Sequence, residues 1–483
     1  MATDAGKGLA EAQRRVGFGG RIYETHTYFF ISSFIPSIMK LWQKSYTVDQ
    51  QIETFTVGQD RELDRYLAPY DILGSLAHIR MLEKIGLLSS EEQQQLSAKL
   101  RQLYQQAIEG DLKIEAGVED IHSQVELLLT RELGDAGKKI HAGRSRNDQV
   151  LVDLRLYFRA ELQEIVALTE RLFTTLMQLA GRHRHILLPG YTHFQAAMPS
   201  SFGLWFSAYA ESLVDDLRLL QSVYHNINQN PLGSAAGYGT SFPLDRHLTT
   251  RLLGFEDLNY NVVHAQMGRG KTELFLSYAL AAIAHSLGKM ASDVVLYVSQ
   301  NFSFLSFPDE LTTGSSIMPH KKNPDVFELI RARCNYLQSL PVQVSQLTTS
   351  LPSGYHRDFQ LLKESIFPAI QHLKDCLGIL TYALPQAKVN PSILADERYQ
   401  YLFSVEVVNE LVLQGVPFRE AYRQVGQQIA EKEFEPPQEL RHTHEGSLGN
   451  LSLEEIEQKM EKVMEGFPFG EVEKAVEVLV GEG

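Results

Sequence analysis

The sequence predicts an all-α fold with three helical domains around a central bundle of long helices. Apolar residues recur three and four positions apart over most of the chain, which is the helical period. Strands do not alternate regularly with helices in the pattern, and there is neither an internal repeat nor a low-complexity segment. The 483 residues are enough for two or three domains and a large core.

Long helices are the main expected elements. Residues 151–179 carry Leu154, Phe158 and Leu162 on one stripe and contain no proline, so they predict a rod roughly 40 Å long. The expected helices cover residues 151–179, about 200–227, about 272–298 and 325–339, and helix resumes near residue 363. Helices of this length cannot bury their apolar stripes alone, so we expect a bundle with a homo-oligomeric core.

The expected domains are an N-terminal helical domain at 1–141, the long-helix bundle at 142–390 and a C-terminal helical domain at 391–483. Near the N-terminus, the apolar run at 28–35 stops at Pro36. It is much shorter than the roughly 20 residues of a membrane span, and it lies too far inside the chain for a usual signal peptide. We therefore expect a cytoplasmic protein.

Composition excludes several classes of function. A net charge of −14 argues against a broad surface for nucleic acid or acidic membranes, because such surfaces need clustered Lys and Arg. The two cysteines, Cys334 and Cys376, show no disulfide spacing. They predict buried thiols in a reducing compartment, and no metal site.

Polar islands separate the long helices at 141–149, 189–195, 314–324 and 351–360. The most informative is the third, Gly-Ser-Ser-Ile-Met-Pro-His-Lys-Lys-Asn-Pro. Asn323 is a suitable N-cap and Pro324 suits the first helical position, so the helix that follows would direct its positive end at the serines. We interpret this island as an anion-handling loop; the alternative is a solvated surface loop.

The other islands each have a structural alternative. Arg146 and Asn147 can donate hydrogen bonds to a carboxylate, but the block 141–149 also suits a helix cap. His193 can carry a proton near neutral pH, although a loop histidine beside aromatic residues is more often structural. The fourth island would by itself pass for a turn and an N-cap.

Together the islands resemble the argininosuccinate lyase family of the fumarase/aspartase superfamily. The matching blocks are 143–149, 190–193, the serine loop with its Lys-Lys-Asn-Pro ending, 351–355 and 415–421, and the similarity covers roughly residues 55 to 480. The resemblance implies an enzyme of arginine biosynthesis that cleaves argininosuccinate to arginine and fumarate by β-elimination. It also implies a homotetramer whose active sites draw on several subunits, with no cofactor.

The resemblance assigns roles to particular residues. Ser315 would be the general base, with its oxyanion stabilised by Lys321, the loop amides and the helix N-terminus. His193, oriented by Glu328, would protonate the departing guanidinium. The substrate-binding residues would be Ser145, Arg146, Asn147, Thr192, Asn323, Tyr355, Gln360, Lys363, Arg269 and Arg357. The family's substrate-binding serine is missing near 55–58.

Other functions remain as alternatives. The segment 265–272 is one residue away from a phosphate-binding P-loop, and the β-like run 261–264 precedes it. A relative that releases fumarate from another substrate, or a non-catalytic helical relative, would also fit the pattern. The catalytic candidates His193, Ser315 and Lys321 are all present, which favours an active enzyme.

Overall fold

The computed structural model describes residues 49–437 and 440–481. The apolar run at 28–35, with Pro36, lies outside these residues. Within them the chain is predominantly helical, and the strands are short and paired two by two. The all-α prediction is therefore confirmed.

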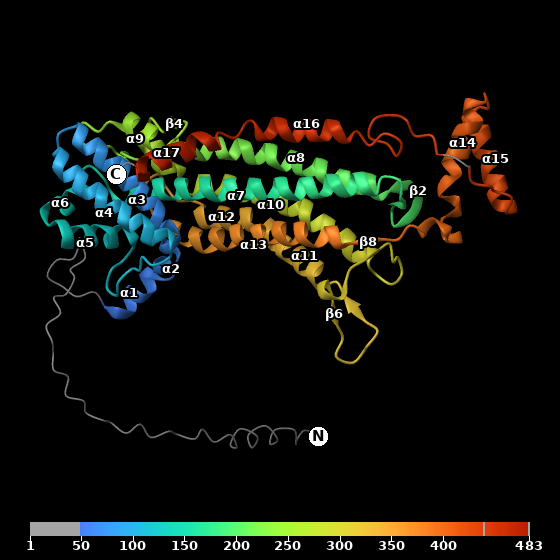
Figure 1. Ribbon diagram of the computed structural model, residues 1–483, viewed down its shortest axis with the longest axis horizontal. Coiled ribbons are helices and arrows are strands. Elements are labelled where there is room, and N and C mark those ends of the chain that lie inside the picture. The colour runs from blue at the N-terminus through green and yellow to red at the C-terminus, as the bar shows by residue number, and fades with distance from the viewer. Residues whose placement is uncertain (1–48, 438–439, 482–483) are drawn as a thin grey trace, which may run out of the picture. The chain divides into compact units, whose positions relative to one another are not determined.

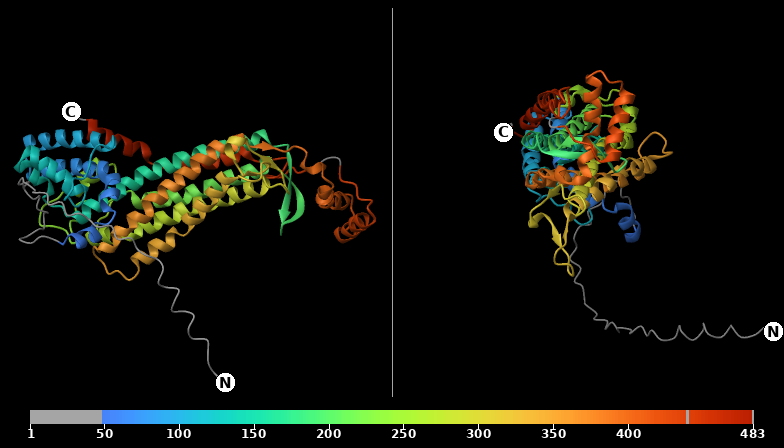
Figure 2. Two further views of the ribbon diagram at one scale, coloured as in Figure 1. Left: turned by 90° about the horizontal axis from the view of Figure 1, so that it is seen from below. Right: turned by 90° about the vertical axis from the view of Figure 1, so that its right-hand side faces the viewer.

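Long helices lying side by side form the centre of the structure (Figures 1 and 2). They pack around one large apolar core, to which all of them contribute buried side chains. The bundle consists of α7 (Arg146–Arg182), α8 (Phe202–Ile227), α10 (Val262–Tyr297), α11 (Asp325–Gln338), α12 (Leu340–Thr348) and α13 (Leu361–Ala383). Each predicted rod is present; α7 and α10 begin earlier than predicted, and α8 and α11 lie within one or two residues of the predicted limits.

The longest helix, α7, begins at a capping box. Ser145 is the N-cap; its Oγ accepts from the backbone N–H of Asn147, and Asp148 accepts from the N–H of Ser145 at 2.8 Å. Both oxygens of Asp148 are used, because its Oδ2 accepts from the N–H groups of Gly233 and Ala235 at 3.0 Å. This buried carboxylate therefore fixes the start of α7 against the loop that follows α8.

Helix α10 is kinked at Arg269 and Gly270, which have non-helical backbone angles. Gly270 has φ of +81°, and a Cβ there would lie 2.7 Å from Thr348 Cγ2, so glycine is required. Residues 262–268, which include most of the predicted β-like run, are helical, with Asn261 as the N-cap. The P-loop interpretation is therefore wrong, because this motif needs a strand before its loop.

α10 is also long and apolar enough to cross a membrane by length and composition, the only such helix among the described residues. Of the most apolar 18-residue window of this helix, 61% is buried inside the structure. Its buried side chains, among them Leu276, Leu280 and Leu287, belong to the bundle core. A core helix passes the same test of length and hydropathy, and the packing of α10 is of that kind.

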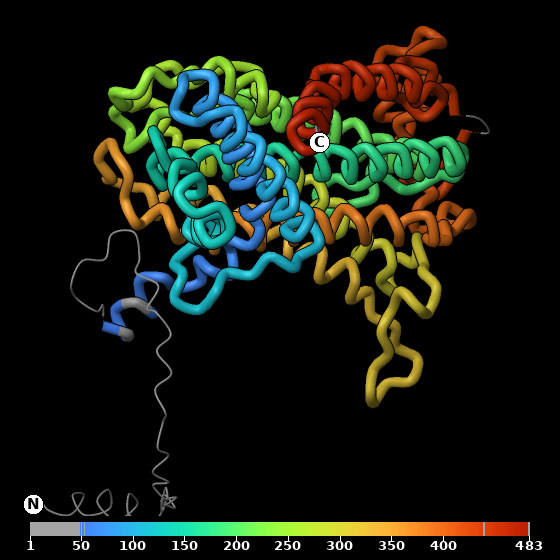
Figure 3. Tube along the Cα trace, turned by 60° about the vertical axis from the view of Figure 1, so that its left-hand side comes forward, coloured from blue at the N-terminus to red at the C-terminus, as the bar shows by residue number. Residues whose placement is uncertain are grey.

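A second helical layer covers the N-terminal end of α7 (Figure 3). It has its own apolar core, which also includes Val152 and Leu156 of α7. The layer contains α1 (Gln50–Val57), α2 (Asp60–Asp64), α3 (Ala68–Lys84), α4 (Ser90–Ile108), α5 (Ile121–Leu133), α6 (Asp135–Lys138) and α9 (Arg246–Leu252). Its helices position acidic side chains beside the start of α7.

The C-terminal helices do not stay together. α14 (Ser404–Leu413) and α15 (Phe418–Glu431) share a small core of Val408, Ala421 and Val425. α16 (Leu453–Met464) returns along α8, and Leu479 of α17 (Phe469–Gly481) packs in the N-terminal core. The domain limits at 141/142 and 390/391 stay a prediction.

Short strands connect the helices. The longest pair is the antiparallel hairpin of β1 (Leu187–Thr192) and β2 (Gln195–Ser201) at the far end of α7. The other pairs are β3 (Gln229–Asn230) with β4 (Asp257–Leu258), β5 (Leu305–Ser306) with β8 (Lys388–Val389), and β6 (Thr313–Gly314) with β7 (Lys322–Asn323). Two of these pairs, β1–β2 and β6–β7, carry three of the four candidate catalytic residues, His193, Ser315 and Lys321, between their strands.

The thiols of Cys334 and Cys376 are free and buried, as predicted.

Candidate active site

The predicted site residues fall into three groups within one chain. A pocket at the N-terminal end of α7 contains Arg146, Arg269, Tyr355, Arg357, Gln360 and Lys363, with Ser145 and Asn147 beside it at the start of the helix. The β1–β2 hairpin carries Thr192 and His193. The β6–β7 loop and the start of α11 carry Ser315, Lys321, Asn323 and Glu328.

The pocket is rich in charges of both signs. Lys363 is buried, and its Nζ lies 2.6 Å from Oδ1 of Asp60 and 2.6 Å from Oδ1 of Asp64. Burial lowers the pKa of Lys363, but Asp64 and Asp60 outweigh it, so the pKa lies above its usual value. Burial raises the pKa of Asp60, against the opposing effect of Lys363. This ammonium is therefore held charged inside the pocket.

Arg269 is also fixed. Its Nε lies 2.8 Å from Glu273 Oε1, and its Nη2 donates to the carbonyl of Phe359 at 2.7 Å. The kink in α10 creates this position, because Glu273 also accepts from the N–H of Gly270. The predicted Arg269 thus extends from the bend in α10 to the segment 351–360, the fourth polar island.

Arg146 is held by residues 119–123, at the start of α5. Its Nε lies 2.7 Å from Asp120 Oδ2, its Nη2 donates to Ser123 Oγ at 3.0 Å, and its Nη1 lies 3.4 Å from Glu119 Oε2. Burial raises the pKa of Asp120, but His122 and Arg146 outweigh it and lower the pKa overall. The guanidinium is oriented through three separate contacts.

Arg357 and Gln360 attach the fourth island to the end of α1. Arg357 Nη2 and Gln360 Nε2 both donate to the carbonyl of Thr56, at 2.9 and 3.1 Å. Gln360 also donates to the carbonyl of Val57 at 2.9 Å. The segment where the family's serine is missing therefore packs directly on the predicted substrate-binding residues.

Several pocket residues were not predicted from the sequence. Asp60, Asp64, Glu119, Asp120 and His122 line the pocket, and the four carboxylates among them supply its negative side. The block Glu-Asp-Ile-His at 119–122, directly before an apolar helix, was the available signal, since Asp120 caps α5. The pocket itself is small, about 50 Å³, against roughly 300–1,000 Å³ for a typical ligand site. It is not a complete substrate site.

His193 occupies the turn of the β1–β2 hairpin. His193 and Phe194 both have positive φ, 53° and 57°, and the pair Thr192 and Gln195 closes the turn. Positive φ at both central residues is the geometry of a tight hairpin turn. The imidazole is exposed, and nothing in the described part of the chain covers it. The role of His193 as a proton carrier stays a prediction.

The serine loop presents Ser315 to backbone donors. The N–H groups of Met318 and Ile317 donate to Ser315 Oγ at 3.1 and 3.4 Å. Lys321 is exposed, and its N–H donates to the carbonyl of Met318, which closes the loop. Two amide dipoles therefore point at the Ser315 oxygen, an arrangement that favours negative charge there.

One detail of the helix start differs from the prediction. Pro324 occupies the N-cap position and α11 starts at Asp325, whereas Asn323 lies in β7 paired with Thr313. The N-cap role of Asn323 and the first-turn role of Pro324 are therefore wrong by one position. Asn323 is used by the hairpin instead, and its Nδ2 donates to Thr313 Oγ1 at 3.5 Å. Glu328 lies one turn into α11, and its Oε1 is 3.9 Å from Nη2 of Arg331.

The three groups are not brought together within one chain. Arg146 and the hairpin of His193 lie at opposite ends of α7, and the 37 residues of this helix span roughly 55 Å. Figure 1 draws the β6–β7 loop as a projection separate from the β2 hairpin.

Comparison with known proteins agrees with the resemblance. Residues 37–338 match a family model described as Lyase. The chain is 58% identical to an argininosuccinate lyase of Bacteroides fragilis, over 92% of this chain and 99% of the relative. It is 42% identical to that of Thermotoga neapolitana, over 80% and 98%. Among solved structures, an EDDS lyase variant with bound fumarate matches with a TM-score of 0.69, 22% identity and coverage of 89% and 93%.

Proposed function

We infer that this chain, which belongs to the argininosuccinate lyase family of the fumarase/aspartase superfamily, builds each active site from three separate surfaces contributed by different subunits. The chain is a carbon–nitrogen lyase that cleaves argininosuccinate into arginine and fumarate, a reaction of arginine biosynthesis. The observation that carries the inference is the separation of the α7 pocket, the His193 hairpin and the Ser315 loop.

Exposed apolar faces support a homotetramer. Tyr278 of α10, Leu329 and Tyr336 of α11 and Val342 of α12 are each at least 44% exposed. Tyr278 and Val342 line the groove between α10 and α12. Helices long enough to form a bundle core but left apolar on one side are covered most easily by copies of themselves. Antiparallel neighbours would bring the end of one α7 to the beginning of another.

In this site Ser315 removes the proton from the carbon beside the carboxylate. The pair of electrons from the C–H bond moves onto that carboxylate, which becomes a dianion, and the proton moves to the serine oxygen. This step needs donors that bind the dianion more tightly than the ground state. Lys321 and the amides of the serine loop supply positive charge for the oxygen of Ser315.

The second step breaks the C–N bond. The electrons of the dianion form the C=C bond of fumarate, and the electrons of the C–N bond go to the guanidinium nitrogen. His193, oriented by Glu328 of another subunit, gives that nitrogen a proton. Ser145, Arg146, Asn147, Thr192 and Asn323 hold the fumarate-side carboxylates, and Tyr355, Gln360, Lys363, Arg269 and Arg357 hold the arginine side.

The cytoplasm is the proposed location, supported by the two free buried cysteines.

Fumarate absorbance after addition of argininosuccinate to the purified protein tests the activity. A folded oligomer that releases no fumarate would identify a non-catalytic relative, and release from another substrate alone would change the substrate.

Subunit exchange tests the shared site. Ser315→Ala and His193→Asn, each inactive alone, should regain part of the wild-type activity after they are mixed, unfolded and refolded together, because some sites then contain neither substitution. The control is each variant refolded alone. If mixed oligomers form and no activity returns, Ser315 and His193 act from one chain.

A further inference from the structure

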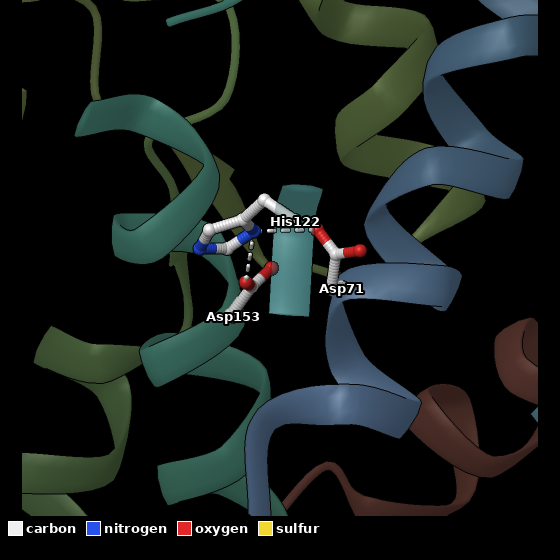
Figure 4. Close-up of side chains that lie close together, drawn as sticks. All are labelled: Asp71, His122 and Asp153. Atoms are coloured by element: carbon white, nitrogen blue, oxygen red, sulfur yellow. Dashed lines mark hydrogen bonds and ion pairs between the residues drawn. The ribbon is translucent and has the colours of Figure 1, made fainter. Parts of the chain in front are cut away.

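His122 lies at the centre of a buried group of charged side chains (Figure 4). Its Nδ1 donates to Asp71 Oδ1 at 2.8 Å and lies 3.5 Å from Asp153 Oδ2. Asp71 belongs to α3, His122 to α5 and Asp153 to α7. All three side chains are buried, and the elimination described above uses none of them.

His122 is held in its charged form. Burial lowers its pKa, but Asp71, Asp153 and Asp120 outweigh burial and raise the pKa to about 9. Arg144 limits the excess of negative charge, since it interacts electrostatically with both Asp71 and Asp153. An imidazolium therefore joins α3, α5 and α7 near neutral pH.

The segment that carries His122 is the same segment that holds Arg146. Glu119, Asp120 and Ser123 all contact the Arg146 guanidinium, and Asp120 is fixed as the N-cap of α5 by the N–H of Ser123 at 2.9 Å. Arg146 and Asp153 are seven residues apart on α7, which places them on one face, two turns apart. The segment 119–123 is thus attached to α7 at two points and to α3 at a third.

We propose that His122 is a positioning residue for substrate binding: its buried ring, in contact with Asp71 and Asp153, fixes the segment 119–123, and this segment sets the direction of the Arg146 guanidinium. The proposal rests on the proposed role of Arg146 in holding a substrate carboxylate. Without His122, Arg146 keeps its charge but loses its fixed orientation. Binding then weakens, while the proton transfers at Ser315 and His193 stay intact.

A divalent cation is the competing occupant, because two carboxylates and an imidazole within 4.8 Å of one another are a possible ligand set. Among the described residues, neither oxygen of Asp153 has a hydrogen-bond partner. However, Nδ1 of His122 is already engaged with Asp71, and Arg144 adds positive charge beside the carboxylates. These features favour an imidazolium over a metal ion.

The test compares His122→Asn and His122→Ala in the full-length protein. Asn retains a donor near the position of Nδ1 without the charge, and Ala removes both. We expect the KM for argininosuccinate to rise at least 10-fold with Asn and further with Ala, while kcat changes less than 3-fold. His78→Asn is the matched control: His78 is equally buried, contacts the carbonyl of Ala142, and its pKa is lowered by burial. It should leave KM within 3-fold.

A double-mutant cycle with Arg146→Lys separates positioning from general loosening. Lys cannot form the oriented fork of Arg, so adding His122→Asn to Arg146→Lys should raise KM less than 3-fold. A KM increase equal to the product of the single effects would overturn the proposal. So would a KM unchanged in His122→Asn, or one equivalent of metal per chain by elemental analysis of the active wild type. Failure of wild type to release fumarate would instead overturn the proposed function.

Discussion

The α7 pocket differs from the two projections that carry candidate catalytic residues, the β1–β2 hairpin and the β6–β7 loop. The difference is how firmly contacts within one chain fix the side chains of each region. In the pocket, Arg146, Arg269 and Lys363 are each fixed by at least two contacts to other side chains or carbonyls. On the projections, His193 and Lys321 are exposed at a hairpin turn and on a loop. The proposed binding side is therefore preorganised within the chain, whereas the proposed catalytic side would be completed by neighbouring subunits.

This difference indicates a division of work. Charges that are already fixed by other contacts would bind a charged substrate with little reorganisation. Exposed projections can reach into a neighbouring subunit and close on bound substrate. Substitutions on the projections should therefore change activity with little effect on stability, and substitutions in the pocket should affect both.

The largest expected effect is that of Ser315→Ala. The substitution removes the proposed general base, so kcat should fall at least ~10²-fold. The melting temperature should stay within about 1 °C, because most of the loop is exposed. Steady-state fumarate release measures kcat, and calorimetry measures the melting temperature. Ser316→Ala, on the same loop, is the control and should keep most of its activity. Near-normal turnover of Ser315→Ala would remove Ser315 from its assigned role.

Much of the fold was predictable because long helices carry a strong periodic signal. The stripe at Leu154, Phe158 and Leu162 gave the rod α7. The hairpin β1–β2 was not predicted. Its strands of six and seven residues show only weak alternation of apolar and polar side chains, and its tight turn contains no glycine. The start of α11 at Asp325 was predicted, but its N-cap was not: Pro324 takes that position, since the β6–β7 pair uses Asn323.

The site was predictable only where residues are unusual in type and spacing. The motifs around Arg146 and Ser315 stand out as polar islands between apolar helices. Asp60, Asp64 and His122 do not, because single charged residues in helical segments usually face solvent. The burial of Asp64 and His122 depends on contacts across more than 50 positions, such as Asp71 with His122 and Asp64 with Lys363, and local sequence does not encode such pairs.

A glycine pair tests the preformed side of the comparison. Gly270→Ala should destabilise the fold by about 1–3 kcal/mol, because its φ is positive and the new Cβ would lie 2.7 Å from Thr348 Cγ2. It should also raise KM, since the kink positions Arg269. Gly378→Ala on α13 is the matched control: no atom lies within 4 Å of its Cβ position, so the helix should gain up to about 1 kcal/mol.

Denaturation at one fixed protein concentration measures both glycine variants, because the stability of an oligomer depends on concentration. Equal effects of Gly270→Ala and Gly378→Ala would show that the kink is not a strained, required feature. A loss of stability in Gly270→Ala without a change in KM would separate Arg269 from substrate binding.

The smallest expected effect is the pH dependence that His122 gives to stability. The pKa of His122 is about 9 in the folded state and 6.5 ordinarily, so between these values the folded chain binds more protons than the unfolded chain. Stability from this group is therefore complete below pH 6.5 and is lost as pH rises through 9. The raised pKa of Asp153 acts in the same direction. The melting temperature of wild type minus that of His122→Asn should thus be largest near pH 6 and shrink by pH 9.5.

For His78→Asn the difference in melting temperature from wild type should stay constant above pH 7, because the lowered pKa of His78 keeps that ring neutral there. A difference for His122→Asn that does not change with pH would mean that His122 is neutral in the folded chain, and that hydrogen bonding alone joins the three helices behind Arg146.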